Sequence, residues 1–349
     1  MPDRPDQGDG PVRLRLPVVG TASAHIMVQV AAEFGMSRSR CLAGTGIEPK
    51  LLDDSLGTIR LFQELAVAGN LVAELGDVPA LGFRIGQRYR LTIYGAWGWA
   101  MLCSPTPRHS LEFASEYLDL SYAMCDVTIR EADGLVRIGV SEQWLPERIG
   151  PFFGQRSVGA VIRLLSDIMP ANGWLKEVRI ASPEGPQAPF FREVIDAPLL
   201  FDRPETEIVV YSGALDHPMP MANEQALQLA ASLCREQLER RRAMLSVGES
   251  VRHYLLQRLA ESPSPATAAL ALGMGTRTLR RRLAEEGTSF RELHDQVRRV
   301  FAVELLEAGL PPARVARRLG YAGPAAFTHA FRRWHGVAPR EFASKNSSQ

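Results

Sequence analysis

Apolar and polar residues follow a helical period between residues 315 and 342, near the C-terminal end of the chain. Four apolar residues recur there at the i, i+3, i+4, i+7 spacing of a helix with one buried face: Phe327, Ala330, Phe331 and Trp334. A shorter apolar stripe precedes them at Val315, Ala316 and Leu319. Between the two stripes lies Gly320, and glycine readily takes the positive φ that ends a helix. The pattern predicts two short helices joined by a tight turn.

The outward side of the second predicted helix is basic and polar. A projection at about 100° per residue places the following residues opposite the apolar face: Ala325, Thr328, His329, Arg332 and Arg333. Two short helices, a glycine-containing turn and a basic outer face are typical of a helix-turn-helix, which lays its second helix in the major groove of DNA. The alternative is a surface helical hairpin with solvated arginines, because such hairpins are common packing units.

A second copy of the same pattern lies upstream. Leu272 and Gly273 correspond to Leu319 and Gly320 of the later turn. Leu279 and Leu283 correspond to Phe327 and Phe331 on the apolar face of the later helix. The outer face of this earlier helix is rich in arginine: Arg277, Arg280, Arg281 and Arg282. One long helix, Ser289–Leu306, is predicted between the two units, with a capping pattern at its start. Duplicated units with matching apolar faces and basic outer faces favour the helix-turn-helix interpretation over the surface hairpin.

The first two-thirds of the chain mixes helical and strand patterns. Helices are predicted over residues 22–75 and 157–169. The strongest strand pattern is a β-hairpin, in which residues 127–130 and 135–140 flank a tight Asp-Gly turn. Further short strands are predicted at residues 178–180, 198–201 and 207–211. Helices interleaved with a partly antiparallel sheet predict an α+β domain that ends near Pro220.

A long helix is predicted to begin after Asn223 and to run to the basic residues at 240–242. Its apolar side suits either a dimer contact or a plain amphipathic linker between two domains, and both interpretations stay open. We expect Gly248 to break the helical pattern before the DNA-binding part begins.

The charge of the chain is divided unevenly. Among 349 residues, 46% are hydrophobic and 23% charged, as in ordinary globular proteins, and the formal net charge is only +1. Residues 245–349, however, carry 16 Lys and Arg against 9 Asp and Glu, a net charge of +7, whereas residues 1–244 carry 24 against 30, a net charge of −6. A basic third on an acidic body indicates a polyanion-binding module attached to a regulatory domain.

Nothing in the sequence indicates an enzyme. The motifs G-x-S-x-G, G-x-x-x-x-G-K-[ST] and H-E-x-x-H and a dinucleotide fingerprint are all missing. No two of the seven histidines lie three or four residues apart, so metal-ligand spacing is missing too. We therefore expect no catalytic residues, no metal site and no cofactor.

The cysteines and the termini suggest the cytoplasm. Cys41, Cys103, Cys125 and Cys234 lie far apart, which argues for buried reduced thiols, with redox sensing as the alternative. The polar start of the chain is not a signal peptide, and its most apolar window, residues 91–103, is too short to span a bilayer.

The last hundred or so residues resemble the DNA-binding region of the AraC/XylS family of bacterial transcription regulators. Two stretches carry the resemblance, LGMGTRTLRRRLAEEGTSFRELHDQVRRVFAVELLEAG and LGYAGPAAFTHAFRRWHGVAP. It implies an all-α C-terminal domain with two helix-turn-helix units joined by a long helix. It also implies a homodimeric activator that binds double-stranded DNA, contacts RNA polymerase and responds to a small-molecule effector.

Two departures from the family pattern bear on DNA reading. Gly275 stands where the family often has a capping serine, and His329 where it often has arginine. A neutral histidine lacks the bidentate guanine contact of arginine, so the second recognition helix is expected to read less sequence. We expect Arg277 and Arg281 to read bases, with Arg280 and Arg282 on bases or phosphates. In the second unit, base reading is expected from Ala325, Thr328 and His329, and phosphate binding from Arg332 and Arg333.

The N-terminal region resembles the arabinose-binding-type effector domain of one branch of this family. The residues that carry this resemblance are Gly95–Ala100, Ser104–Thr106 and Pro218–Pro220. The following aromatic residues are candidates for lining an effector pocket, with core packing as the alternative for each: Tyr94, Trp97, Trp99 and Trp144.

The predicted organisation is a disordered tail at residues 1–18, an effector-binding and dimerisation domain at 19–220, a connector helix at 221–246 and a DNA-binding domain at 247–345. Two other functions stay open at this point: an N-terminal enzyme tethered to DNA, and a ligand-independent DNA-binding protein.

Overall fold

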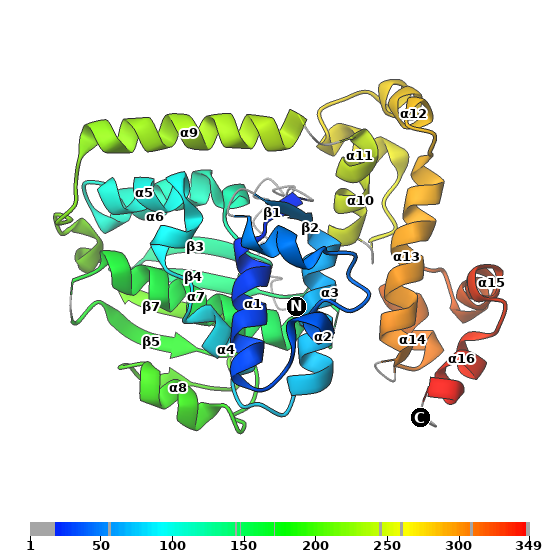
Figure 1. Cartoon of the computed structure of the whole chain (residues 1–349), viewed down its shortest axis with the longest axis horizontal. Helices are drawn as coiled ribbons and strands as arrows, with labels where there is room; N and C mark the ends of the chain where they lie inside the picture. The colour runs from blue at the N-terminus through cyan, green and yellow to red at the C-terminus, as the bar shows by residue number, and fades with distance from the viewer. Residues whose placement is uncertain are drawn as a thin grey trace, which may run out of the picture.

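A five-stranded sheet lies within the N-terminal two-thirds of the chain in the computed structural model (Figure 1). The structure describes residues 18–54, 57–143, 145–146, 148–170, 172–243, 246–258, 261–307 and 310–346. The strand order is β3-β4-β7-β5-β6, with β5 and β6 parallel and the other pairs antiparallel. The strands are β3 Asp126–Ala132, β4 Leu135–Ser141, β5 Leu175–Arg179, β6 Leu199–Leu200 and β7 Thr206–Tyr211. A separate ribbon pairs β1 (Val18–Gly20) with β2 (Thr58–Arg60).

The predicted β-hairpin is confirmed by strands β3 and β4. Their register pairs Ala132 with Leu135 across a two-residue loop. Both loop residues have positive φ, 55° at Asp133 and 70° at Gly134. Positive φ at both positions is the geometry that an Asp-Gly hairpin turn requires, because it matches the twist of the flanking strands.

Helices surround this sheet, and one close helix pair positions a residue of the site described below. The helices are α1 Ala22–Glu33, α2 Arg38–Cys41, α3 Leu61–Leu75, α4 Leu81–Gly86, α5 Ala96–Cys103, α6 Pro107–Glu116, α7 Gly150–Ile168 and α8 Ala188–Val194. Helices α4 and α7 approach so closely that a Cβ on Gly86 would lie 2.2 Å from the carbonyl oxygen of Arg156. Glycine on α4 therefore lets α7 pack inward, and Arg156 becomes almost fully buried.

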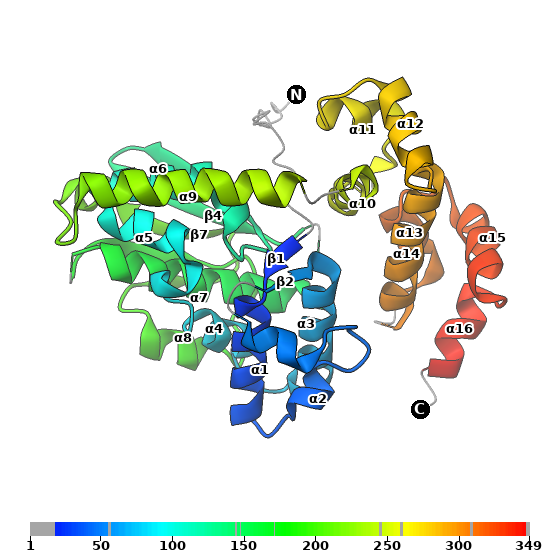
Figure 2. The same ribbon diagram turned by 45° about the horizontal axis from the view of Figure 1, so that its top comes forward.

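The predicted connector is helix α9, Glu224–Ala243, which runs from the sheet domain towards the C-terminal helices (Figures 1 and 2). Asn223 caps its start, because the Asn223 Oδ1 accepts a hydrogen bond from the Ala226 N–H at 2.9 Å. Ala230 and Cys234 are buried with the apolar core of the N-terminal domain. The inner side of α9 therefore packs on that domain, whereas Leu229 and Leu233 on its outer side are exposed.

The C-terminal part consists of helices around a separate apolar core. They are α10 Val247–Gln257, α11 Pro265–Ala271, α12 Thr276–Glu285, α13 Phe290–Glu307, α14 Pro312–Arg318, α15 Pro324–His335 and α16 Pro339–Asn346. Their buried residues form one cluster, distinct from the cluster of the N-terminal domain. The structure confirms the fold class expected from the sequence. It consists of an α+β domain followed by an all-α domain with two helix-turn-helix units.

One local expectation is wrong. Gly248 does not break a helix but lies in the first turn of α10. The turn is stabilised there because the Glu286 carboxylate accepts hydrogen bonds from the backbone N–H groups of Val247 and Gly248, at 2.6 and 2.8 Å. Of the tail predicted at residues 1–18, residues 1–17 lie outside the described residues and Val18 begins β1.

Candidate nucleic-acid interface and buried cavity

The two helix-turn-helix units share one turn geometry. Gly273 follows α11 and Gly320 follows α14, and each has a φ of 66°. The residue after each glycine donates its N–H to the carbonyl five residues back, Met274 to Ala269 and Tyr321 to Ala316, both at 2.9 Å. This hydrogen bond is the signature of a Schellman motif, which satisfies the last carbonyls of a helix. The similarity inferred from the two sequences therefore extends to the backbone.

The second helix of each unit buries the face that the sequence predicts. Leu279 and Leu283 of α12 and Phe327 and Phe331 of α15 are at most 1% exposed. The outer face of α12 is exposed at Arg277, Arg280, Arg281 and Arg282. The outer face of α15 is exposed at Ala325, His329, Arg332 and Arg333. Both recognition helices thus combine an apolar inner face with an accessible, mainly basic outer one.

Three of these side chains have partners within the protein. Thr328 is half-buried, and its hydroxyl donates to the Pro324 carbonyl at 2.8 Å. Arg333 pairs with Asp295 of α13 at 2.6 Å. Arg281 lies 3.6 Å from Glu285, and both of these side chains are well exposed. The Arg281 contact competes little with DNA, because exposed ion pairs contribute only about 0.2–1 kcal/mol.

Helix α13 joins the two units and supports both. The Ser289 Oγ accepts the N–H of Glu292 at 3.3 Å, as its capping pattern predicts, and it also donates to the Glu292 carboxylate at 3.1 Å. With 18 residues, α13 is about 27 Å long at 1.5 Å per residue. That length is of the same order as one turn of duplex, about 34 Å. In Figures 1 and 2, α12 and α15 lie towards opposite ends of α13.

Arg298 of α13 fixes the turn of the second unit. Its Nε donates to the Leu319 carbonyl at 2.8 Å and its Nη2 to the Gly320 carbonyl at 3.1 Å. The guanidinium also lies over the Tyr321 ring, 4.4 Å from its centroid. Burial lowers the pKa of Arg298 from its ordinary value. Arg298 therefore holds the turn that precedes α15, a structural role that the sequence did not reveal.

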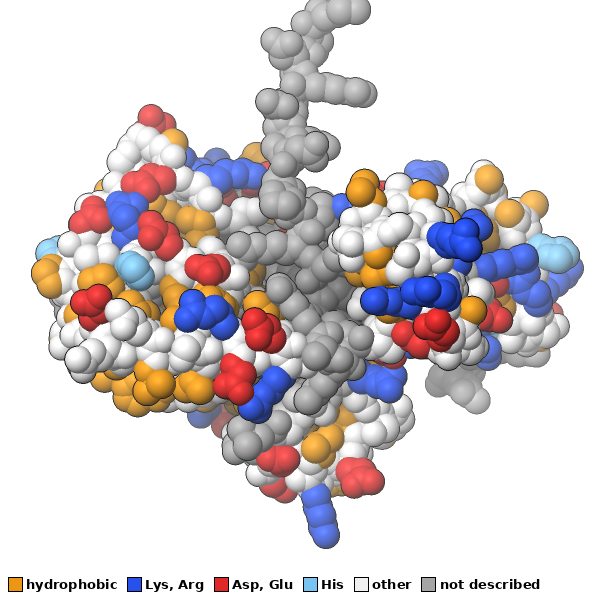
Figure 3. All heavy atoms as spheres, turned by 90° about the horizontal axis from the view of Figure 1, so that it is seen from above, with side chains coloured by type: hydrophobic (Ala, Val, Ile, Leu, Met, Phe, Trp, Pro, Cys, Tyr) orange, Lys and Arg blue, Asp and Glu red, His pale blue; other side chains and the backbone are white. Residues whose placement is uncertain are grey.

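Figure 3 shows how the charges are distributed on the face seen from above. Lys and Arg side chains gather over the C-terminal helices, whereas acidic and basic side chains are mixed over the N-terminal domain. This arrangement agrees with the net charges of the two parts of the sequence. On this face, the basic side chains are thus concentrated on the part that carries the helix-turn-helix units.

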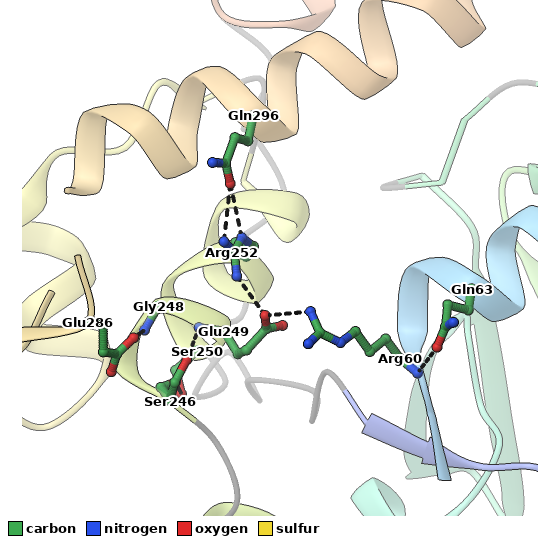
Figure 4. A network of polar contacts seen from close by, with 9 residues as sticks. All are labelled: Arg60, Gln63, Ser246, Gly248, Glu249, Ser250, Arg252, Glu286 and Gln296. Atoms are coloured by element: carbon green, nitrogen blue, oxygen red, sulfur yellow. Dashed lines mark hydrogen bonds and ion pairs between the residues drawn. The ribbon is translucent and has the colours of Figure 1, made fainter. Parts of the chain in front are cut away.

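An ion-pair network joins the two domains (Figure 4). Arg60, at the end of β2, donates through Nη1 to the Glu249 carboxylate of α10 at 3.0 Å. The same Glu249 oxygen accepts from Arg252 at 2.6 Å, and Arg252 also donates to Gln296 of α13 at 3.2 Å. Arg60 is more than half exposed, whereas the Glu249 side chain is only 18% exposed. We call Arg60, Glu249, Arg252 and Gln296 the interdomain network.

An apolar cavity of about 100 Å³ lies within the N-terminal domain, between α5, α6, α7 and the strands β3 and β4. Tyr94 and Trp97, two of the predicted effector-binding residues, line it. Trp99 does not line it, because its side chain is 51% exposed on the other side of α5. Trp144 lies outside the described residues.

Four aromatic rings form one wall of this cavity. The Tyr94 ring centroid lies 4.8 Å from that of Trp97 and 4.9 Å from that of Tyr122, and Tyr89 packs behind them. Burial raises the pKa of Tyr89 and Tyr94 above the ordinary value of 10.0 and that of Tyr122 to about 12. All three phenols are therefore neutral at pH 7.

A buried polar cluster closes the inner end of the cavity. Arg156 of α7 donates through Nη1 to the Glu64 carboxylate of α3 at 2.7 Å and to the Ser23 Oγ at 2.9 Å. Its Nη2 donates to the Tyr122 carbonyl at 2.8 Å. The side chains of Arg156 and Glu64 are 2% and 0% exposed. The sequence held a signal for each of these two residues, though not for their pairing, because each interrupts the apolar face of its helix.

The remaining chemistry of the described residues is sparse. They contain no group of three or more His, Cys, Asp or Glu side chains arranged to hold a metal ion. All four cysteines are buried free thiols, and burial raises the pKa of Cys234 to about 11. Across the part of the chain that the structure describes, no helix is both long and apolar enough to cross a bilayer.

Two helix-turn-helix units on one supporting helix, beside a separate α+β domain with a cavity, define a two-domain helix-turn-helix DNA-binding protein. Residues 35–219 match the family described as the arabinose-binding N-terminal domain of AraC transcription regulator, and residues 268–345 match a helix-turn-helix domain family. The chain belongs to the AraC family of transcription regulators, as its resemblance indicated.

Two sequence relatives of similar length agree with this assignment. An uncharacterized HTH-type transcriptional regulator of Mycobacterium tuberculosis is 32% identical over 342 residues, which cover 96% of this chain and 98% of the relative. The ornithine utilization regulator of Pseudomonas aeruginosa is 27% identical over 339 residues, covering 95% and 98%. The crystal structure of the transcriptional regulator CdpR from P. aeruginosa aligns at 25% identity with a TM-score of 0.43, covering 80% of this chain and 91% of that one.

Proposed function

We propose that this regulator reads duplex DNA with α12 and α15 in successive major grooves, under the control of a small molecule bound in the N-terminal domain. The observation that supports DNA reading most directly is the duplicated unit. Each recognition helix presents an exposed, mainly basic face, and α13, about 27 Å long at 1.5 Å per residue, lies between the two units. No catalytic role is proposed, since the relatives are named as regulators.

The proposed roles follow the chemistry of each side chain. Arg277 and Arg281 read bases, because a guanidinium donates two parallel hydrogen bonds to guanine. Arg280 and Arg282 contact bases or phosphates. In the second unit, Ala325, Thr328 and His329 face base edges, while Arg332 and Arg333 bind phosphates. The Thr328 hydroxyl already donates its hydrogen to the Pro324 carbonyl. Thr328 can therefore contact a base through its methyl group, or by accepting a hydrogen bond at the hydroxyl oxygen.

A paired substitution tests the division between base readers and phosphate binders. The full-length chain would first select its operator from random duplexes. We expect Arg281→Ala to weaken operator binding by about 1–3 kcal/mol and to relax preference at one base pair. Arg332→Ala, the control, should weaken operator and random DNA equally. Equal losses on both DNAs for Arg281→Ala would contradict base reading by Arg281.

The remaining parts of the proposal concern regulation and assembly. We propose the division into residues 19–220, 221–246 and 247–345 as effector domain, connector and DNA-binding domain. The regulator would act in the cytoplasm as a homodimer and activator that contacts RNA polymerase. Sedimentation of the full-length chain, with and without operator, tests dimerisation. Transcription in vitro from a promoter carrying the selected operator tests activation, and an output unchanged or lowered by the regulator would contradict it.

A further inference from the structure

We propose that the cavity beside Tyr94 and Trp97 binds a small, neutral, mainly apolar molecule that carries one hydrogen-bond acceptor. The inference rests on the effector control proposed above and specifies the chemistry of the effector. It follows from the size of the cavity, the charges along its wall and one unpaired donor.

The size and lining of the cavity favour a compact apolar ligand. Its volume of about 100 Å³ is somewhat below the roughly 150 Å³ of an engineered apolar cavity that binds benzene. Most of its wall is hydrocarbon or aromatic, including Met101, Leu111, Val127, Ile138 and Leu164. A ligand of about one aromatic ring or a short branched aliphatic chain is of the right order of size and suits this wall.

The charges along the wall exclude an ionised ligand. Arg156 is the one charged side chain among the described residues that line the cavity, and Glu64 already neutralises it at 2.7 Å. A carboxylate placed there would compete with Glu64 for the same guanidinium and leave a second buried anion. A cation would instead face Arg156 across a medium of low dielectric constant. Either ion would lose its hydration without gaining a free partner, which is costly.

The polar group of the ligand is inferred from Trp97. This side chain lines the cavity and is 3% exposed, and its indole Nε1 has no hydrogen-bond partner among the residues that the structure describes. An indole N–H only donates, and leaving it buried and unpaired costs about 1–3 kcal/mol. A carbonyl or ether oxygen on the ligand would satisfy it.

The opening and the surroundings of the cavity suit an effector site. Ile129 lines the cavity and is also 38% exposed on the edge strand β3, so the cavity reaches the surface there. On the inner side, Tyr122 packs against Gly20 of β1, where a Cβ would lie 3.2 Å from the Tyr122 ring.

Two structural connections run from the cavity to the interdomain network. Strand β1 pairs with β2, with Val18 opposite Arg60. Helix α3, which carries Glu64, begins at the residue after Arg60. A ligand that shifts Tyr122 or Arg156 therefore acts on the elements that hold Arg60 against the DNA-binding domain.

Binding of matched probes to the full-length chain tests the ligand class. The probes are acetophenone (neutral, with an acceptor), toluene (neutral, without one), benzoate, benzylamine and arabinose, and dissociation constants come from thermal shifts and tryptophan fluorescence. We expect acetophenone to bind at least tenfold more tightly than benzoate, benzylamine or arabinose. Preferred binding of any of these three, or no binding of acetophenone at millimolar concentration, would overturn the inference.

Three variants locate the binding site. Ala160→Leu fills the cavity from α7 and should lower the affinity for acetophenone at least tenfold. Ser166→Leu, the control on the exposed side of α7, should leave that affinity unchanged. Trp97→Phe removes the donor while keeping a ring, so acetophenone should lose affinity and toluene should not. Equal effects of Trp97→Phe on the two probes would refute the role given to the indole N–H.

Operator affinity separates this inference from the proposed effector control. If acetophenone binds as described but leaves operator affinity unchanged, the ligand class stands and effector control through this cavity fails. If arabinose or benzoate alters operator affinity and acetophenone does not bind, effector control stands and the ligand class is wrong.

Discussion

The buried pair of Arg156 and Glu64 should dominate the stability of the N-terminal domain. The two side chains are 2% and 0% exposed and 2.7 Å apart, so neither charge is hydrated when its partner is removed. Breaking a buried ion pair by removing one partner typically costs about 3–5 kcal/mol. We therefore expect Glu64→Gln to destabilise the domain by roughly that amount. Arg156→Met should cost at least as much, because Ser23, Tyr89 and the Tyr122 carbonyl also lose a donor.

A double-mutant cycle separates the pair from the packing around it. With Arg156→Met and Glu64→Gln combined, no unpaired charge remains, so the loss should be smaller than the sum of the two single losses by at least about 2 kcal/mol. Urea unfolding followed by tryptophan fluorescence measures this. Four of the five tryptophans, at positions 97, 99, 144 and 174, report on the N-terminal domain. A loss below about 1 kcal/mol for Glu64→Gln, or additive losses in the double variant, would refute the reasoning.

Three further outcomes are expected. The first is a double-mutant cycle of Arg60→Ala and Glu249→Gln, measured by denaturant unfolding. Because Arg60 is largely exposed, the coupling free energy of the pair should be only about 0.2–1 kcal/mol. A coupling of zero would argue against the interdomain pair. Burial, with Arg298 nearby, lowers the pKa of His294 to about 4 from 6.5, so the neutral form is favoured in the folded state. Its contribution to stability is present above pH 6.5 and is lost as the pH falls towards 4. Lowering the pH from 7 to 5 should therefore cost the C-terminal domain about 1–2 kcal/mol in denaturant unfolding, and His294→Phe should remove this part of the pH dependence. Operator affinity should fall steeply with salt, and Arg332→Ala should reduce the log–log slope by about 1, whereas an unchanged slope would argue against phosphate binding by Arg332.

The sequence predicted most of the DNA-binding domain because its signals are local. The spacing of Phe327 and Phe331, and the glycine at 320, determine a helix face and a turn within a few residues of each other. The hairpin at Asp133 was predictable for the same reason. Gly248 was misjudged because the carboxylate that stabilises its helix turn comes from Glu286, which no local pattern connects to it.

The cavity was only partly predictable. The aromatic residues at 94, 97 and 99 are all apolar and close in sequence, yet only the first two line it, since Trp99 lies on the exposed side of the same short helix. The pairing of Arg156 with Glu64 spans 92 residues and depends on the packing of α4 against α7. Contacts of that kind arise from tertiary packing, which periodicity does not encode.

The Glu286 carboxylate makes the connections of the two recognition helices to the N-terminal domain unequal. It follows directly on α12 and holds the first turn of α10, the same turn from which Glu249 reaches Arg60. The second reader, in contrast, is tied to α13 through Arg298 and Asp295. If the effector control proposed above holds, a rearrangement of the N-terminal domain would reach α12 by a shorter route than α15. An inducing signal would then change the DNA contact of α12 first, while α15 would keep its position on the duplex.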